Sequence, residues 1–139
     1  MTHRIAPLLL ASLLTPTSIL AADDLPALRK GMWEFHRTLA GQGAGGKDAQ
    51  LDSKKCVDPW VNMNAMKQAL AKQGCKATPG SMKGNVRTSV TECPMQGAMV
   101  RSETVMTIAN DSAYTVNITT TGGGKTSKET LVAKRVGDC

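Results

Sequence analysis

Four cysteines in a short chain that carries an export signal are the feature that most constrains the fold. Cys56, Cys75, Cys93 and Cys139 make up the whole cysteine content of the 139 residues. An even number of cysteines in a small exported chain predicts disulfides, because oxidising compartments form and keep these bonds whereas the cytosol reduces them. A chain of this length has a modest core and benefits from covalent links. We therefore expect a domain held by two disulfides outside the cytoplasm.

The first 22 residues have the pattern of a cleavable export signal. Two basic-type residues at positions 3 and 4 precede an apolar run over 5–20, and Ala21 and Ala22 are small residues suited to cleavage. The apolar run is roughly fifteen residues long, whereas a membrane-spanning helix needs about twenty. Two aspartates follow it instead of a basic flank. We expect residues 1–22 to be removed, leaving a single domain over 23–139 that does not span a membrane.

Most of the remaining chain alternates between apolar and polar residues, as half-buried strands do. In 32–39, for example, Trp33 and Phe35 share one face of the strand and Glu34 and His36 share the other. Clusters of Gly, Asn and Asp between the alternating segments indicate turns. The predicted strands are 32–39, 49–57, 76–82, 86–93, 99–108, 114–121 and 127–136.

One helix interrupts the strands. Asp58 can accept hydrogen bonds from the free amides of a first helical turn, and Pro59 fits the first helical position. The helix should continue to about residue 73, because Gly74 suits the left-handed conformation that ends many helices. Apolar side chains recur along it at spacings of three and four and form one stripe, made of Trp60, Met63, Met66 and Leu70.

The predicted fold is therefore mostly β. We expect an antiparallel meander of about seven strands curved into an open or closed barrel, with one short helix between the second and third strands and two disulfides. The helix would lie on the sheet or plug the mouth of the barrel. The predicted structural core consists of Trp33, Phe35, Trp60, Met63, Met66, Leu70, Tyr114, Val116 and Ile118.

Two disulfide pairings are compatible with this order of elements. Cys75 and Cys93 lie almost equally far from the Gly84 turn, so in a hairpin they face each other, which leaves Cys56 for Cys139. The competing pairing joins Cys56 to Cys75 across the helix and Cys93 to Cys139. We favour the first pairing.

An ordered set of short motifs runs through the chain after the signal. The motifs are Gly31-Met32-Trp33-Glu34, Cys56-Val57, Cys75, Gly84-Asn85-Val86, Cys93, Tyr114 and Lys134-Arg135-Val136-Gly137-Asp138-Cys139. In this order they resemble a family of small exported bacterial proteins, domain of unknown function 3617. The resemblance implies a β-rich periplasmic or secreted domain, and it supplies no catalytic residues. The sequence departs from the expected pattern at Met32, where leucine is expected, a nearly isosteric change.

The sequence contains no pattern typical of a catalytic or metal site. His36 is the only histidine after the signal, and oxidised cysteines leave no thiolates for zinc. We expect the strand carboxylates to pair with lysine or arginine on neighbouring strands rather than to act as acid and base. The 122–124 glycine run followed by Lys125 resembles a phosphate loop only superficially and is predicted to be a hairpin turn. No cofactor is expected.

The methionines allow one alternative. Thioethers are ligands for monovalent copper, and the closest pairs are Met63 with Met66 and Met95 with Met99. The chain has one Phe and one Tyr, however, so flexible methionines are the available filling for its core. Core packing is the favoured interpretation.

Two classes of function remain. The favoured hypothesis is a non-enzymatic module of the cell envelope whose concave face binds a small apolar ligand or an envelope component. The net charge of +6 favours anionic envelope material, while the scarcity of aromatic residues disfavours nucleic acid. The alternative is a protein-binding inhibitor of periplasmic hydrolases, for which a cationic target would be repelled. An enzyme or a methionine copper site ranks third.

Overall fold

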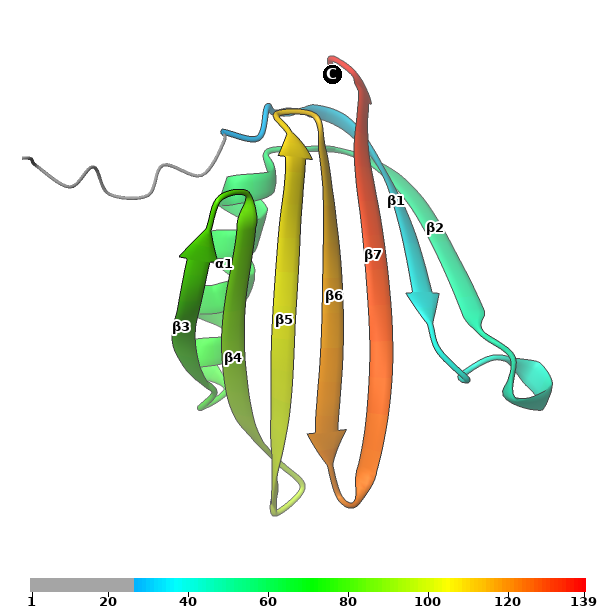
Figure 1. Ribbon diagram of the computed structural model, residues 1–139, viewed down its shortest axis with the longest axis vertical. Helices are drawn as coiled ribbons and strands as arrows, with labels where there is room; N and C mark the ends of the chain where they lie inside the picture. Colours follow the sequence, from blue (N-terminus) through cyan, green and yellow to red (C-terminus); the bar gives the residue numbers. More distant parts are fainter. Residues whose placement is uncertain (1–26) are drawn as a thin grey trace, which may run out of the picture.

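The computed structural model describes residues 27–139, which form one antiparallel sheet and one helix (Figure 1). The predicted signal over 1–22 lies outside the described residues. A short 3-10 turn, η1 (Ala44–Gly46), lies in the first hairpin loop. The main elements are β1 (Gly31–Leu39), β2 (Ala49–Val57), α1 (Pro59–Lys72), β3 (Lys76–Lys83), β4 (Val86–Met95), β5 (Ala98–Asn110), β6 (Ala113–Gly122) and β7 (Lys125–Gly137).

The seven strands pair in the order β2-β1-β7-β6-β5-β4-β3. Because β2 and β3 lie at opposite edges and do not pair with each other, the sheet is open. The mostly β prediction is confirmed, and of the two forms it allowed, the structure has the open one. The helix follows one edge strand and precedes the other, so the chain crosses the full width of the sheet at α1, which lies behind β3 and β4 in Figure 1.

Glycine conformations fix the tight hairpins. Gly84 has a φ of 58° between β3 and β4, and Gly123 and Gly124 have φ values of 57° and 73° between β6 and β7. Two-residue hairpins need this left-handed region because it matches the twist of the flanking strands. The glycine run before Lys125 is therefore a hairpin turn, as predicted.

The hydrophobic core gathers at one end of the sheet, which we call the core end. Trp33 has no exposed surface, its ring centre lies 5.5 Å from that of Tyr114, and its Nε1 donates a hydrogen bond to the carbonyl of Arg29 at 3.0 Å. The strand register places these residues together, because Tyr114 lies between Ala133 and Ile108 on the neighbouring strands. The core residues are Leu28, Trp33, Met106, Ile108, Tyr114 and Ala133.

The predicted core is only partly correct. Trp33 and Tyr114 are buried, and Phe35, Trp60, Met63 and Val116 pack against the core. The assignment of Met66 was wrong, because this side chain is 63% exposed. Leu70 and Ile118 are half-buried and lie outside the core cluster. The physical reason is the position of the helix, which lies over the sheet without closing onto it.

Helix α1 begins where the sequence predicted. Asp58 Oδ1 accepts hydrogen bonds from the amides of Trp60 and Val61 at 3.1 and 3.3 Å, and Gly74 follows the helix with a φ of 84°. Pro59 is its only buried residue. Tertiary burial normally supplies most of a helix's stability, so this helix depends on its two attachments. None of the described helices is long and apolar enough to cross a membrane.

The two disulfides provide those attachments. Cys56 is bonded to Cys139 and Cys75 to Cys93, the pairing that the sequence favoured, with Cα separations of 5.7 and 4.1 Å. Cys56 lies three residues before α1, and Cys75 lies three residues after it. A disulfide therefore connects the chain to the rest of the sheet at each end of the helix, and we call the helix held in this way the strap.

Candidate functional site

A groove of about 970 Å³ lies between α1 and the side of the sheet that faces it. We call it the α1 groove. Alternate residues of the strands line it, as the two-residue period of a strand requires. The apolar side chains that the strands contribute are Phe35, Leu51, Ala77, Pro79, Met106, Tyr114, Val116, Ile118 and Leu131.

The strand register orders the sheet wall of the α1 groove into rows. Next to the core end, Phe35, Ala133, Tyr114 and Ile108 lie side by side on four strands. The next row is Arg37, Leu131, Val116, Met106 and Arg87, an apolar strip with an arginine at each side.

The two rows farther from the core end are increasingly polar. Ile118 lies beside Thr104, which in turn lies beside Ser89. Thr120 lies beside Ser102, and their hydroxyl oxygens are 2.9 Å apart. The groove wall therefore changes from aromatic and aliphatic to hydroxyl-bearing along the strands. This gradient allows one end of a bound molecule to be apolar and the other to be hydrated.

The helix forms the opposite wall with its apolar stripe. Trp60 and Met63 line the α1 groove near the core, and Leu70 lines it farther along. Lys67 lies four residues after Met63 and three before Leu70, so it occupies the same helical face. The stripe is therefore apolar with one cation inside it.

The charged residues of the α1 groove are unequally paired. Arg37 Nε lies 2.9 Å from Glu129 Oε1, and the Glu129 side chain is only 24% exposed. Lys55, Lys67 and Arg87 also line the groove, and none of them forms an ion pair with any residue in the described part of the chain. These three cations are free to interact with a bound anion.

One perturbed ionisable group adjoins the α1 groove. Burial raises the pKa of Tyr114 to about 12, because the surrounding apolar side chains disfavour the phenolate. The phenol therefore stays neutral at physiological pH. It contributes a polarisable ring and a hydroxyl to the groove wall rather than a charge.

The strand glutamates pair with basic side chains, on neighbouring strands as predicted except for Glu103, whose partner Arg101 lies on the same strand. Glu34 lies 3.2 Å from Lys54 Nζ, and Arg101 contacts both Glu92 and Glu103, at 3.5 and 3.1 Å. Glu129 pairs with Arg37 as described above. Each carboxylate therefore has a cationic neighbour, and no two of them converge in the α1 groove.

His36 has a carboxylate partner at the surface. Its Nδ1 lies 2.9 Å from Asp52 Oδ1, and both side chains are more than half exposed. His36 alternates with Phe35 and so points to the opposite side of the sheet. Within residues 27–139 no group of three or more His, Cys, Asp or Glu side chains is arranged to hold a metal ion.

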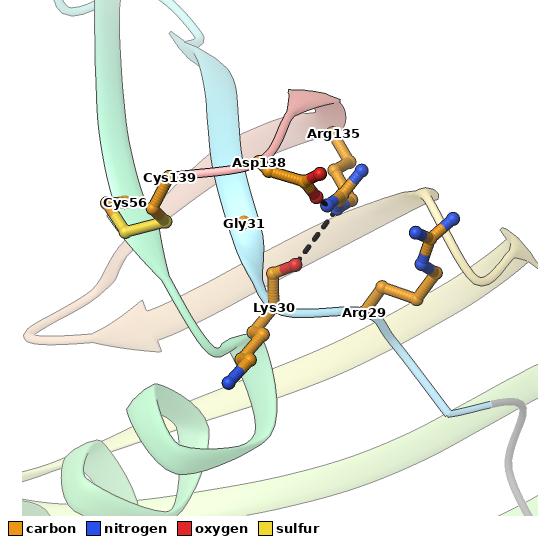
Figure 2. Close-up of a pocket in the computed structure, with 7 residues that line it drawn as sticks. All are labelled: Arg29, Lys30, Gly31, Cys56, Arg135, Asp138 and Cys139. Carbon is orange, nitrogen blue, oxygen red and sulfur yellow. Dashed lines mark hydrogen bonds and ion pairs between the residues drawn. A yellow bond between two sulfur atoms is a disulfide. The ribbon is translucent and has the colours of Figure 1, made fainter.

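A second, smaller hollow lies at the core end, beside the chain's C-terminus (Figure 2). Arg135 uses its guanidinium there to donate a hydrogen bond to the Lys30 carbonyl at 2.9 Å and to pair with Asp138. Gly31 has a φ of 155°, and a Cβ at this position would lie 2.5 Å from both Arg135 Nε and the Gly137 carbonyl oxygen. Only glycine allows this close approach. The residues around this hollow thus connect the two ends of the domain, and we call their contacts the joint.

This joint explains why the distinctive motifs of the sequence are spread along the chain. The motif at Gly31 meets the motif that ends at Cys139, and Cys56 is bonded to the latter. Asn85 lies at the same end, where it exchanges hydrogen bonds of 2.9 Å with the backbone of Ile108. Most of the motifs that carry the resemblance therefore build the core end and its covalent joint, whereas Cys75 and Cys93 form their disulfide near the β4–β5 hairpin at the other end.

The sequence predicted the apolar residues of this site but not the groove between helix and sheet or the cations that line it. It identified both walls as apolar faces, through Phe35 and Val116 on the strands and Met63 on the helix. It did not identify Arg87 or Lys67, although Lys67 interrupts the helical stripe in a way that the sequence alone displays.

Comparison with known proteins assigns the chain to a family. No curated protein and no solved structure matches the chain. A family model described as "Protein of unknown function (DUF3617)" matches residues 28–139, which is nearly all of the described domain. The chain therefore belongs to this family.

Proposed function

We propose that this chain is a non-enzymatic module of the cell envelope that binds a small apolar ligand in the α1 groove. The observation that carries the proposal is an apolar helix stripe facing an apolar sheet wall across space that protein atoms do not fill. A volume of about 970 Å³ lies at the upper end of the range for pockets that enclose drug-sized molecules.

The exposure of the groove residues supports this proposal energetically. Leu51 and Met66 line the α1 groove and are 53% and 63% exposed. Covering apolar surface releases about 25 cal/mol for each Å² removed from water. An apolar molecule bound in the groove would therefore be stabilised by covering side chains that are exposed to solvent in the protein alone. Large exposed apolar patches of this kind typically mark binding sites.

The covalent design supports a location in the periplasm or outside the cell. Two disulfides persist in an oxidising compartment. Together with the predicted signal over 1–22, they favour export and removal of that segment. A rigid sheet with a fastened strap keeps the α1 groove formed without a ligand, which lowers the entropic cost of binding.

Native mass spectrometry of protein recovered from a bacterial periplasm is the direct test. We expect a population with added mass in the range of a small organic molecule, released by organic solvent. A complex with another protein and no small-molecule adduct would instead favour the inhibitor alternative.

A binding assay with a groove-filling variant complements this test. The neutral fluorophore N-phenyl-1-naphthylamine should gain fluorescence with the native protein. Ile118→Trp should weaken its binding at least tenfold, because the larger ring occupies the α1 groove. Thr119→Trp is the matched control, since its side chain lies on the other side of the same strand. Equal binding by the two variants would contradict the proposed site.

A further inference from the structure

We propose that the ligand of the α1 groove is an anionic amphiphile with one long acyl chain, whose headgroup interacts with Lys67 and Arg87. This inference rests on the proposed function and specifies the chemistry of its ligand. The juxtaposition that points to it is an apolar strip facing the helix stripe, with Lys67 on the helix and Arg87 on the sheet, neither of which has a carboxylate partner within residues 27–139.

Lys67 is the first of these cations. It follows Met66 on the helix, lies on the same face as Met63 and Leu70, and lines the α1 groove. A lysine can lay its aliphatic stem along apolar surface while its ammonium group stays at the water boundary. It therefore places a positive charge at the edge of the apolar space.

Arg87 is the second cation and lies on the opposite wall. It is half-buried on β4, directly beside Met106 on β5, in the row that continues with Val116 and Leu131. The helix lies behind β3 and β4 in Figure 1, and Arg87 lines the α1 groove from β4. Guanidinium groups bind carboxylates and phosphates with two parallel hydrogen bonds.

The pairing of the charges leaves the α1 groove with an excess of positive charge. Arg37, in the same row as Arg87, is already neutralised by Glu129, and Asp52 pairs with His36. The unpaired cations are Lys55, on the edge strand β2, and Lys67 and Arg87, on α1 and β4. An anionic headgroup placed between helix and sheet would interact with Lys67 and Arg87, while its acyl chain covers Met106, Val116 and Leu131.

The chain's overall charge agrees with this ligand class. The sequence has 17 Lys and Arg against 11 Asp and Glu. A positive surface raises the local concentration of anionic amphiphiles and speeds their association. A neutral hydrocarbon would gain nothing from these charges, so the arrangement favours an amphiphile over a purely apolar molecule.

The test compares ligands that differ only in charge. Palmitate and hexadecanol, below the concentrations at which they aggregate, compete with N-phenyl-1-naphthylamine for the protein at pH 8 and low salt. We expect palmitate to bind at least tenfold more tightly than hexadecanol. Added sodium chloride should reduce this preference, because salt screens partly exposed charges. Palmitoyl lysophosphatidylglycerol forms a further arm, and tighter binding than palmitate would identify a phosphate as the preferred headgroup.

Variants assign the preference to the two cations. Lys67→Gln and Arg87→Gln should each weaken palmitate binding about fivefold and leave hexadecanol binding unchanged. Lys76→Gln is the matched control, because Lys76 is exposed and lies outside the α1 groove. Intact mass shows whether each preparation still contains residues 1–22. The assays use protein that lacks them, so that the apolar segment over 5–20 cannot occupy the groove.

The outcomes separate this inference from the function it rests on. Equal affinities for palmitate and hexadecanol would overturn the headgroup assignment while apolar binding stands. A preference that survives both glutamine variants would also overturn it. Failure of all four probes to bind would instead remove the proposed function itself.

Discussion

At the scale of single residues, we expect Trp33 to contribute most to the free energy of unfolding. Its side chain is fully buried, contacts Tyr114 and donates a hydrogen bond to Arg29. Trp33→Ala should lower the free energy of unfolding by about 3–5 kcal/mol, because it leaves a large cavity and removes the ring contact. Urea unfolding measures this change. Val132→Ala is the control, since Val132 is 45% exposed and should change stability by less than about 1 kcal/mol. Equal effects would contradict the assigned face of β1.

Tyr114 gives the same core a pH dependence. Burial raises its pKa from 10.0 to about 12, whereas the unfolded phenol ionises near its ordinary value. Unfolding therefore releases a proton above pH 10, and this contribution to stability is lost as the pH rises from about 10 to about 12. By pH 11 the native protein should lose about 1.4 kcal/mol more than Tyr114→Phe, relative to pH 9.

The comparison with Tyr114→Phe isolates the phenol, because the lysines and arginines titrate alike in both proteins. Parallel curves of unfolding free energy against pH for the two proteins would show that the phenol is not shielded from water. They would also place Tyr114 outside the core.

At the scale of elements, the two disulfides hold α1 in place over the sheet. The helix buries only Pro59, so packing contributes little to its position, and the disulfides at Cys56 and Cys75 hold its two ends. The Cys75–Cys93 bond closes a loop of 18 residues and the Cys56–Cys139 bond one of 83. In the chain-entropy model these loops stabilise the fold by about 3 and 4–5 kcal/mol respectively.

Removing the first of these bonds should loosen one end of the strap. Replacing Cys75 and Cys93 together by alanine should lower stability by about 3 kcal/mol. It should also increase amide hydrogen exchange in α1 and β3 and leave β5–β7 protected. Replacement of Cys56 and Cys139 is the comparison, and it should instead increase exchange at the C-terminal end of β7. Uniform loss of protection in both variants would show that the strap is not an independent unit.

The elements were largely predictable because their signals are local. Asp58 and Pro59 mark the helix start, Gly84 marks a hairpin, and the alternation at Trp33 marks a strand, each within a few residues. Burial was less predictable because it depends on how far the helix lies from the sheet. Met66 shares the helical stripe with Met63, and only tertiary position exposes one and half-buries the other. Met106, Ile108 and Ala133 lie in the core through register between strands that are distant in sequence, and Leu28 reaches it from the segment before β1; no local pattern encodes either.

At the scale of the whole molecule, the two ends of the sheet have different roles. The core end contains the buried aromatic pair, the joint between Gly31 and Arg135, and the Cys56–Cys139 bond. Away from it, the wall of the α1 groove becomes polar through Thr104 and Thr120. The fold thus concentrates its stability at one end and leaves apolar surface available along the strap. Its stability should therefore depend on whether the groove is occupied.

Ligand binding should accordingly stabilise the whole domain and protect one element most. At palmitate concentrations one hundred times the dissociation constant, the free energy of unfolding should rise by about 2.7 kcal/mol, because the ligand binds the folded state alone. Hydrogen exchange should slow in α1 and on β5–β7, whose residues line both walls. It should change little in the loop at 41–48, which lies outside the groove. Ile118→Trp should show neither effect, since its groove is filled. If palmitate stabilised that variant as much as the native protein, it would bind elsewhere, for example on the basic outer surface. The assignment of palmitate to the α1 groove would then be wrong.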